Sequence, residues 1–296
     1  MKKIYFLFGI FVLFASCSNS IPEFKKEEAF TFLEEQCDLG TRFPGSEEIE
    51  LCRNYIISTL DQFGAVIEKQ EFFVEIEAVQ YAGVNIIASY FPEMNRRILL
   101  GAHYDTRPWA DKEENQNLHN SAIIGANDGA SGVAVLLEIA AVLSDNPSPR
   151  FGVDLVFFDL EDMGNYGDNG SWCLGSKYFA ENFPLKIPEK AIIVDMIGDA
   201  DLQIFMEYYS YHNSPKLVNE IWNIAKVRGF YEFKHKIGTA VVDDHLPLIR
   251  NGINAIDIID FDYPYWHTLE DTPDKCSAKS LYIVGQTLLD LIYKTK

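Results

Sequence analysis

The chain has 296 residues, enough for one large or two ordinary domains, and 48% of them are hydrophobic and 14% aromatic. This composition supports a packed core and excludes an intrinsically disordered protein. The net charge of −19 argues against nucleic-acid binding, which needs a basic surface, and against electrostatic attraction to anionic lipid.

The N-terminal 24 residues are predicted to be a targeting segment and a tether. Two lysines precede an apolar run over residues 4–15, which is too short to span a bilayer as a helix. The run ends in small residues before Cys17, a pattern that resembles a bacterial lipoprotein cleavage box. We expect a lipoprotein signal peptide over residues 1–16, lipidation of Cys17 and a tether over 17–24. The alternative is an ordinary secretory signal with an incidental cysteine.

Either signal would place the mature protein outside the cytoplasm. Lipidation of Cys17 would attach it to a membrane, facing the periplasm or the cell surface.

Residues 25–296 are predicted to form a single domain, because no repeat or low-complexity linker interrupts them. The first elements are helices over 27–36 and 46–63; the second begins at Ser46, a good N-cap, and stops at Gly64. Alternating polarity predicts a half-exposed strand over 66–77. Two further strands, 84–91 and 98–102, are expected to be antiparallel at the sheet edge.

The rest of the chain alternates helices at 130–143, 176–181, 215–227 and 278–293 with strands at 153–158, 191–196 and 253–259. These strands are continuous apolar runs, which are typical of parallel strands buried on both faces. The predicted fold is therefore α/β, with a central mixed, mostly parallel β-sheet flanked by helices on both faces. Two long glycine-rich polar loops, 108–125 and 163–171, are candidates for a functional role.

Residues suited to metal binding or proton transfer follow one apolar run after another: His103, Asp105, Asp128, Glu161, Asp162, Asp195 and His267. Each has an ordinary alternative explanation; Asp128, for example, could be only a helix N-cap. In open α/β sheets, however, the ligand crevice lies outside the carboxyl ends of the strands. If these strands share one sheet, the side chains converge as a catalytic zinc site requires.

The cysteines of the mature domain match no zinc-thiolate spacing: Cys37, Cys52, Cys173 and Cys276. An oxidising compartment would permit disulfides, but four cysteines allow three pairings, and the sequence does not choose among them. Buried free thiols are the expectation.

Five segments carry a resemblance to a known superfamily: HYDT, GANDGASGVAVLLEIA, FFDLED, VDMIGD and WHTLEDT. In order and spacing they resemble the zinc aminopeptidase and glutaminyl cyclase superfamily, from about residue 25 to the C-terminus. Within it, the Trp266-His267 pair, the SWCLGSKYF segment and the DDH sequence at 243–245 are most similar to the glutaminyl-peptide cyclotransferases.

The resemblance implies cyclisation of the N-terminal glutamine of peptides and proteins to pyroglutamate, with release of ammonia. It implies one catalytic Zn²⁺ held by Asp128, Asp162 and His267. Many animal relatives have Glu at the position of Asp162, which is one methylene shorter, and both side chains can bind zinc. Three aromatic residues are expected to wall a dry pocket: Trp266, Trp172 and Tyr265. Core packing is an equal alternative for Trp172.

The proposed proton shuttle is Glu161, which would take a proton from the attacking amine and give one to the departing nitrogen. We expect its neighbours Asp195 and Asp243 to raise its pKa by like-charge interaction and a shared proton.

Three residues are candidates for a second metal site or for supporting positions: His103, Asp105 and His245. In the aminopeptidase branch, the residue that matches His103 binds a second zinc and Asp128 bridges both metals. Because every ligand of a two-zinc site is retained, a zinc aminopeptidase with one or two zincs is the alternative function. A third possibility, a non-catalytic binding module that has lost the metal, is disfavoured because no ligand is missing.

Overall fold

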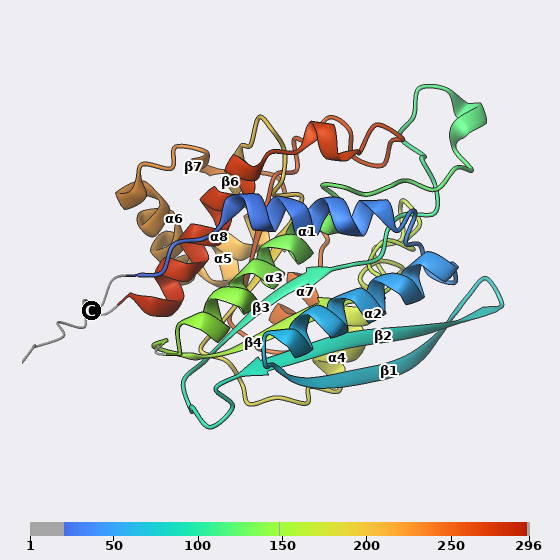
Figure 1. Ribbon diagram of the computed structural model, residues 1–296. Coiled ribbons are helices and arrows are strands. Elements are labelled where there is room, and N and C mark those ends of the chain that lie inside the picture. The colour runs from blue at the N-terminus through green and yellow to red at the C-terminus, as the bar shows by residue number, and fades with distance from the viewer. Residues whose placement is uncertain (1–20, 148, 295–296) are drawn as a thin grey trace, which may run out of the picture.

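The computed structural model describes residues 21–147 and 149–294. At its centre lies a six-stranded sheet in the order β1-β2-β4-β3-β5-β8, with helices on both faces (Figure 1). This arrangement confirms the predicted α/β fold with a mixed, mostly parallel sheet. The predicted signal peptide over 1–16 and the lipidated Cys17 lie outside the described residues, so both stay predictions.

The sheet combines an antiparallel edge with a parallel centre. The long strands β1 (Val66–Ile76) and β2 (Val79–Tyr90) form a hairpin, and β2 also pairs antiparallel with β4 (Gly152–Phe158). The strands β3 (Arg97–His103), β4, β5 (Lys190–Asp195) and β8 (Ala255–Ile259) run parallel to one another.

The prediction that strand 98–102 lies antiparallel at the sheet edge is wrong. This strand, β3, lies between β4 and β5 and is parallel to both. Every residue of β3 is buried, as expected for a central strand covered on both faces. Its closeness in sequence to β2 suggested a hairpin, but the connection between them instead carries the chain past β4.

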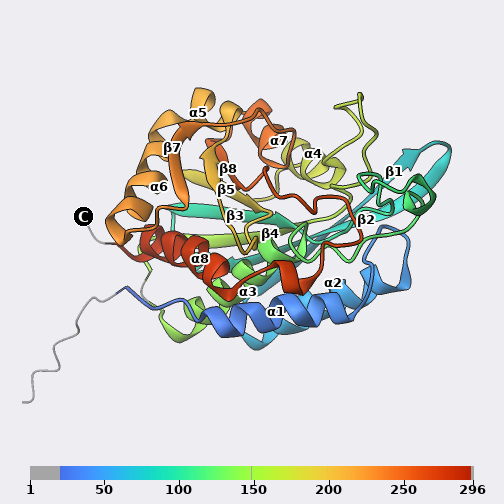
Figure 2. The ribbon, with the colours of Figure 1, turned by 90° about the horizontal axis from the view of Figure 1, so that it is seen from above.

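Helices cover the two faces of the sheet unequally (Figure 2). One face carries the longer helices α1 (Lys26–Asp38), α2 (Glu47–Gln62), α3 (Ala130–Asp145) and α8 (Ala278–Tyr293). The opposite face carries α4 (Leu174–Glu181) and α7 (His245–Arg250), which contact each other. Each predicted helix forms within a residue or two of its expected ends. The predicted N-cap is also present, since the Ser46 side chain accepts a hydrogen bond of 3.1 Å from the Ile49 amide.

A small second sheet beside β8 was not predicted. It pairs β6 (Ile204–Met206) in parallel with β7 (Phe233–Ile237). The helix α6 (Pro215–Arg228) packs against β7, and α5 (Tyr208–Asn213) packs against α6 and β8. Both strands are short, and most of β7 is exposed, so neither has the apolar run of a core strand. Two 3₁₀ turns complete the described elements: η1 (Gln116–Leu118) and η2 (Pro273–Lys275).

The packed domain begins slightly before residue 25. Phe24 is buried, and its backbone amide donates a 2.9 Å hydrogen bond to Gln286 Oε1 on α8. The last residue of the predicted tether is therefore packed into the core of the domain. None of the described helices is long and apolar enough to cross a membrane.

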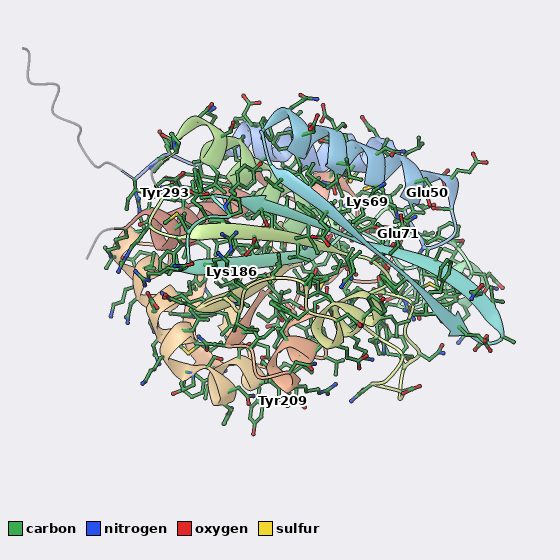
Figure 3. The ribbon with its side chains drawn as sticks, turned by 90° about the horizontal axis from the view of Figure 1, so that it is seen from below. Glu50, Lys69, Glu71, Lys186, Tyr209 and Tyr293 are labelled. Atoms are coloured by element: carbon green, nitrogen blue, oxygen red, sulfur yellow. The ribbon has the colours of Figure 1, made fainter. Side chains whose placement is uncertain are left out.

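The outer strand β1 is protected by charged side chains. Figure 3 shows Lys69 and Glu71 on this strand, and both residues are exposed. Charged residues on an edge strand disfavour pairing with another chain.

Candidate metal and catalytic site

The candidate site lies where the parallel strands end. β3 ends at His103 and β5 at Asp195, while Glu161 follows the end of β4. Asp128 stands just before α3, which packs against β3 and β5. Because β3, β4 and β5 run in the same direction, their carboxyl ends meet at one edge of the sheet.

The structure brings together the three predicted zinc ligands, Asp128, Asp162 and His267. They are all buried, and their ligand atoms lie within 4.8 Å of one another. His267 Nε2 is 3.3 Å from Asp128 Oδ2 and 3.1 Å from Asp162 Oδ1.

These three side chains fit a divalent cation. Asp128 Oδ2 and both carboxylate oxygens of Asp162 are buried and accept no hydrogen bond from any described residue. Buried carboxylate oxygens without partners are costly unless a cation balances them. One imidazole nitrogen and two carboxylates form the donor set of a catalytic zinc site, with a fourth position left for substrate.

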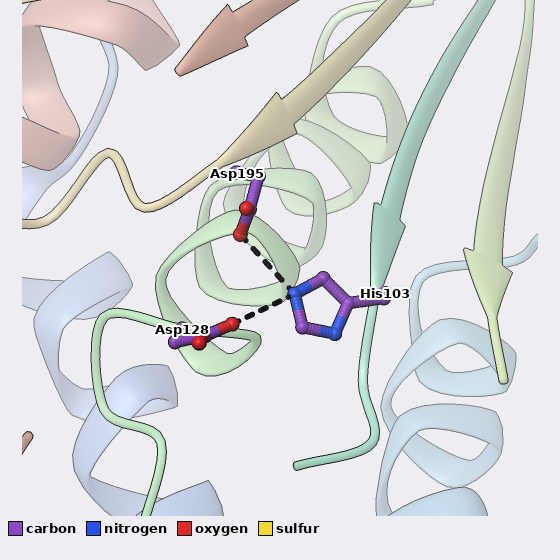
Figure 4. A group of neighbouring side chains, drawn as sticks. All are labelled: His103, Asp128 and Asp195. Carbon is purple, nitrogen blue, oxygen red and sulfur yellow. Dashed lines mark hydrogen bonds and ion pairs between the residues drawn. The ribbon is translucent and has the colours of Figure 1, made fainter. Parts of the chain in front are cut away.

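A second group shares Asp128 with the first (Figure 4). His103 Nε2 lies 3.2 Å from Asp128 Oδ1 and 3.1 Å from Asp195 Oδ1. The donor set of a second metal position is therefore assembled next to the first.

Asp105 faces the protein backbone. Its two carboxylate oxygens accept hydrogen bonds from the backbone amides of Glu161 (3.1 Å) and Asp162 (3.2 Å). Asp105 therefore fixes the segment that carries the predicted shuttle and one of the predicted ligands.

Glu161 lies in a buried cluster of acidic groups. Burial raises its pKa well above the ordinary range, and the carboxylates of Asp162, Asp244 and Asp243 raise it further, against the lowering effect of His103. Burial likewise raises the pKa of Asp195 to about 7. Carboxyl groups that hold protons near neutral pH suit general acid–base catalysis.

The thiol of Cys173 contacts the same carboxyl group, with Sγ 3.2 Å from Glu161 Oε1. Burial raises the pKa of this thiol, so it is a hydrogen-bond donor and not a thiolate nucleophile. Cys37, Cys52 and Cys276 are also buried and free, as expected.

His245 belongs to a separate buried group behind Asp243. Its Nε2 lies 3.2 Å from Glu207 Oε2, and its Nδ1 lies 3.7 Å from Asp257 Oδ2. His245 therefore does not join the groups around Asp128. Glu207 and Asp257 were not predicted as site residues, because Glu207 follows a short strand and Asp257 lies within an apolar one.

A cavity of about 160 Å³ opens onto these groups. Its lining includes Glu161, Asp195, Asp243, Trp172, Trp266 and His267. The Trp172 ring stacks on the imidazole of His267 with 6.1 Å between ring centres and 11° between planes, and the Trp266 ring lies 4.2 Å from the same imidazole. Both tryptophans therefore line the cavity, and Trp172 is half-buried.

The prediction that Tyr265 walls this pocket is wrong. Its ring packs 5.6 Å from that of Tyr263, and the Lys275 ammonium lies 5.0 Å above it. Tyr265 lines a different, acidic surface hollow with Asp199 and Asp274. The chain turns here, so the Trp266 side chain points toward the site and the Tyr265 side chain points away from it.

Two residues that were not predicted from the sequence support His267. Tyr166 Oη lies 2.7 Å from His267 Nδ1, and Asp111 Oδ1 lies 3.5 Å from the same atom. Asp111 is itself held by Arg107. A histidine that binds metal through one nitrogen usually donates a hydrogen bond from the other. Asp111 lies in the polar loop 108–125 and Tyr166 in the polar loop 163–171. The length and composition of these loops were the only features of the sequence that indicated a functional role there.

The backbone turns sharply at three points of the site. Leu160, directly before Glu161, has φ 55°, Met196, directly after Asp195, has φ 46°, and His267 has φ 55°. This left-handed conformation is uncommon for side chains other than glycine, and such strain gathers at functional sites. The turns aim successive side chains into the pocket.

Comparison with known proteins agrees with this geometry. The pattern of peptidase family M28 matches residues 85–292. The chain is 23% identical to a glutaminyl-peptide cyclotransferase of Bos taurus, over 81% of this chain and 74% of the relative.

Two solved structures from Bacteroides thetaiotaomicron are similar along nearly the whole chain. One is a glutaminyl cyclase bound to N-acetylhistamine, with TM-score 0.90, 36% identity, and coverage of 94% of this chain and 100% of that one. The other is a leucine aminopeptidase precursor with the same TM-score and identity, covering 94% and 99%.

Proposed function

Because the chain belongs to peptidase family M28 and is an enzyme of the glutaminyl cyclase type, we propose that it cyclises the N-terminal glutamine of peptides and proteins to pyroglutamate, releases ammonia and depends on zinc. One observation carries this proposal: the predicted ligand His267 and the acidic group of Glu161 line the same tryptophan-walled pocket. The pocket is small, as an intramolecular reaction of one side chain requires.

Asp128, Asp162 and His267 would hold the zinc. When bound, zinc supplies Lewis-acid polarisation of the γ-carbonyl group of the substrate glutamine. Tyr166 and Asp111 would keep the imidazole of His267 oriented through its Nδ1 atom.

Glu161 would move the proton. A bond forms between the α-amine nitrogen and the γ-carbon, and the bond from that carbon to the side-chain nitrogen breaks. Glu161 accepts the proton that the amine loses and delivers it to the departing nitrogen, which leaves as ammonia, so the carboxyl group ends in its starting state. Water is not consumed, and the rings of Trp172 and Trp266 would keep it away from the reacting atoms.

A zinc aminopeptidase is the second candidate, and a specific observation favours it. The group of His103, Asp128 and Asp195 assembles the donors of a second metal position beside the first. The similar leucine aminopeptidase precursor points the same way.

Two peptides that differ only in their first residue separate the candidates. The purified protein is incubated with a glutamine-initiated and a leucine-initiated peptide while ammonia and free amino acid are measured and bound zinc is counted. Release of ammonia from the glutamine-initiated peptide, with no product from the leucine-initiated peptide, supports the cyclase. Free leucine without ammonia would establish the hydrolase instead.

We also propose that the mature protein is a lipoprotein anchored outside the cytoplasm through Cys17. The small residues before this cysteine support the proposal. Cells that produce the full chain and a Cys17→Ser variant are labelled with a fatty-acid analogue and fractionated. Label and membrane association should both disappear in the variant; equal membrane association of unlabelled protein would contradict the proposal.

A further inference from the structure

A second cavity adjoins the pocket that contains Glu161 and His267. Its volume is about 220 Å³, and its lining includes Phe205 on β6, Lys236 and Ile237 at the end of β7, and Thr239 in the following loop. We call it the β7 groove. Ligand sites for drug-sized molecules usually measure roughly 300–1,000 Å³, so this volume suits a single large side chain better.

The β7 groove shares a wall with the candidate catalytic pocket. Val241, Ile259 and Phe261 line both cavities. The Phe261 ring also lies 5.1 Å from that of Trp266, which walls the catalytic pocket. A peptide with its N-terminal glutamine in the pocket can therefore extend over this shared wall into the groove. At about 3.3–3.6 Å per extended residue, the positions within reach are the few that directly follow the glutamine.

The accessible lining of the groove is apolar and polar in nearly equal parts, and a few large side chains form the apolar part. Ile237 is 40% exposed, and Phe205 and Phe261 are partly exposed. Burial of such surface against an apolar side chain is favourable.

The charged groups of the groove do not specify a charged ligand. Glu207 is buried, and its carboxylate already accepts hydrogen bonds from the amides of Tyr209, Ser210 and Val241. Lys236 forms no salt bridge within the described part of the chain, and its ammonium lies 5.8 Å from the centre of the Phe205 ring. One exposed cation, Lys236, and one exposed anion, Asp262, line the groove. These exposed charges balance each other, so they do not select a ligand of either sign.

We propose that the β7 groove is a specificity subsite that binds an apolar, preferably aromatic, side chain at one of positions 2–4 of the substrate peptide. The inference rests on the proposed cyclase function and names the substrates that it favours. Peptides with such a residue shortly after the N-terminal glutamine bind more tightly than peptides without one.

The test uses the full mature enzyme and a set of short peptides. The parent is Gln-Ser-Ser-Ser-amide, and three others carry Phe at position 2, 3 or 4. One Phe peptide should have a KM roughly tenfold below that of the parent, with kcat unchanged, as expected for apolar contacts remote from the reacting atoms. If no Phe position lowers KM, the inference is wrong.

Two substitutions locate the effect in the groove by opposite means. Ile237→Ser removes apolar lining, and Thr239→Trp fills the space. Both should remove most of the Phe advantage. A matched control is Val227→Ser on α6, which changes another exposed apolar residue, 79% exposed, outside the groove, and should keep the advantage. Equal loss in the control, or no loss in either groove variant, would overturn the assignment.

The dipeptide Gln-Ser-amide separates this inference from the proposed function. It has no apolar side chain to place in the groove, so Ile237→Ser and wild type should cyclise it at equal rates. Absence of its cyclisation by the wild type would contradict the proposed function. Cyclisation without any preference among the longer peptides would contradict the subsite alone.

Discussion

Replacement of Glu161 by Gln separates proton transfer from metal binding. The substitution preserves shape, so no cavity forms. The backbone amide of residue 161 still donates to Asp105, and the Cys173 thiol can still donate to the side-chain oxygen of the amide. The neighbouring predicted ligand, Asp162, is not altered. Only the ability to accept and return a proton is lost.

The expected loss of kcat in Glu161→Gln is about 10²- to 10⁴-fold, the usual contribution of general acid–base catalysis. This corresponds to about 3–5 kcal/mol of transition-state stabilisation. Stability should not fall, because the change removes one acidic group from a cluster that contains Asp243 and Asp244. Inactivity with full zinc content and an unchanged melting temperature is therefore the expected result.

The assay combines kcat for a glutamine-initiated peptide with zinc content and thermal melting. Glu71→Gln, on the exposed face of β1, is the matched control and should behave as wild type (Figure 3). Loss of zinc in Glu161→Gln would mean that Glu161 is a ligand and that the roles assigned to it and Asp162 are exchanged. A fall in kcat of less than about tenfold would refute its role as the shuttle.

Other variants test the ligands, their support and the fold. His267→Ala should release zinc, measured by metal analysis after dialysis, whereas retained stoichiometric zinc would contradict its assignment. Tyr166→Phe should weaken zinc binding about 10- to 100-fold in a chelator competition, because Nδ1 of the histidine loses a partner. Arg97→Met leaves the carboxylate of Asp154 buried and unpaired, so the free energy of unfolding in urea should fall by about 3–5 kcal/mol. Burial raises the pKa of Glu138 to about 7, so its carboxyl group costs stability as pH rises from about 4.5 to 7. Glu138→Gln should therefore gain stability relative to wild type between pH 5 and pH 8, and a constant difference would contradict this.

The convergence of the site residues could be predicted because it follows from the topology. His103 and Asp195 end parallel strands, and Glu161 follows another, so any shared parallel sheet brings them to one edge. The direction of β3 was harder to predict. Its closeness in sequence to β2 favoured an antiparallel pair at the sheet edge, whereas in the structure it is a fully buried central strand. Strand order depends on packing over the whole sheet, which local patterns do not encode.

The supporting residues could not be predicted for a different reason. Tyr166 and Asp111 reach His267 from long loops whose paths depend on contacts made elsewhere. Tyr265 was expected in the pocket with Trp266, but the side chains of these neighbouring residues point in different directions. Asp257 resembled an incidental polar residue in an apolar strand, and only the fold places it beside His245.

The left-handed turns beside the predicted catalytic groups are held in place by the core. The conformation of Leu160 and Met196 costs roughly 1–2 kcal/mol at each position, against a total stability of about 5–15 kcal/mol for an ordinary protein. Both side chains are buried, so glycine or asparagine at either position would relieve that strain but lose about 2–5 kcal/mol of packing. A screen for thermostable variants should therefore leave both positions unchanged, and the strain next to Glu161 and Asp195 persists because the same two side chains anchor the core.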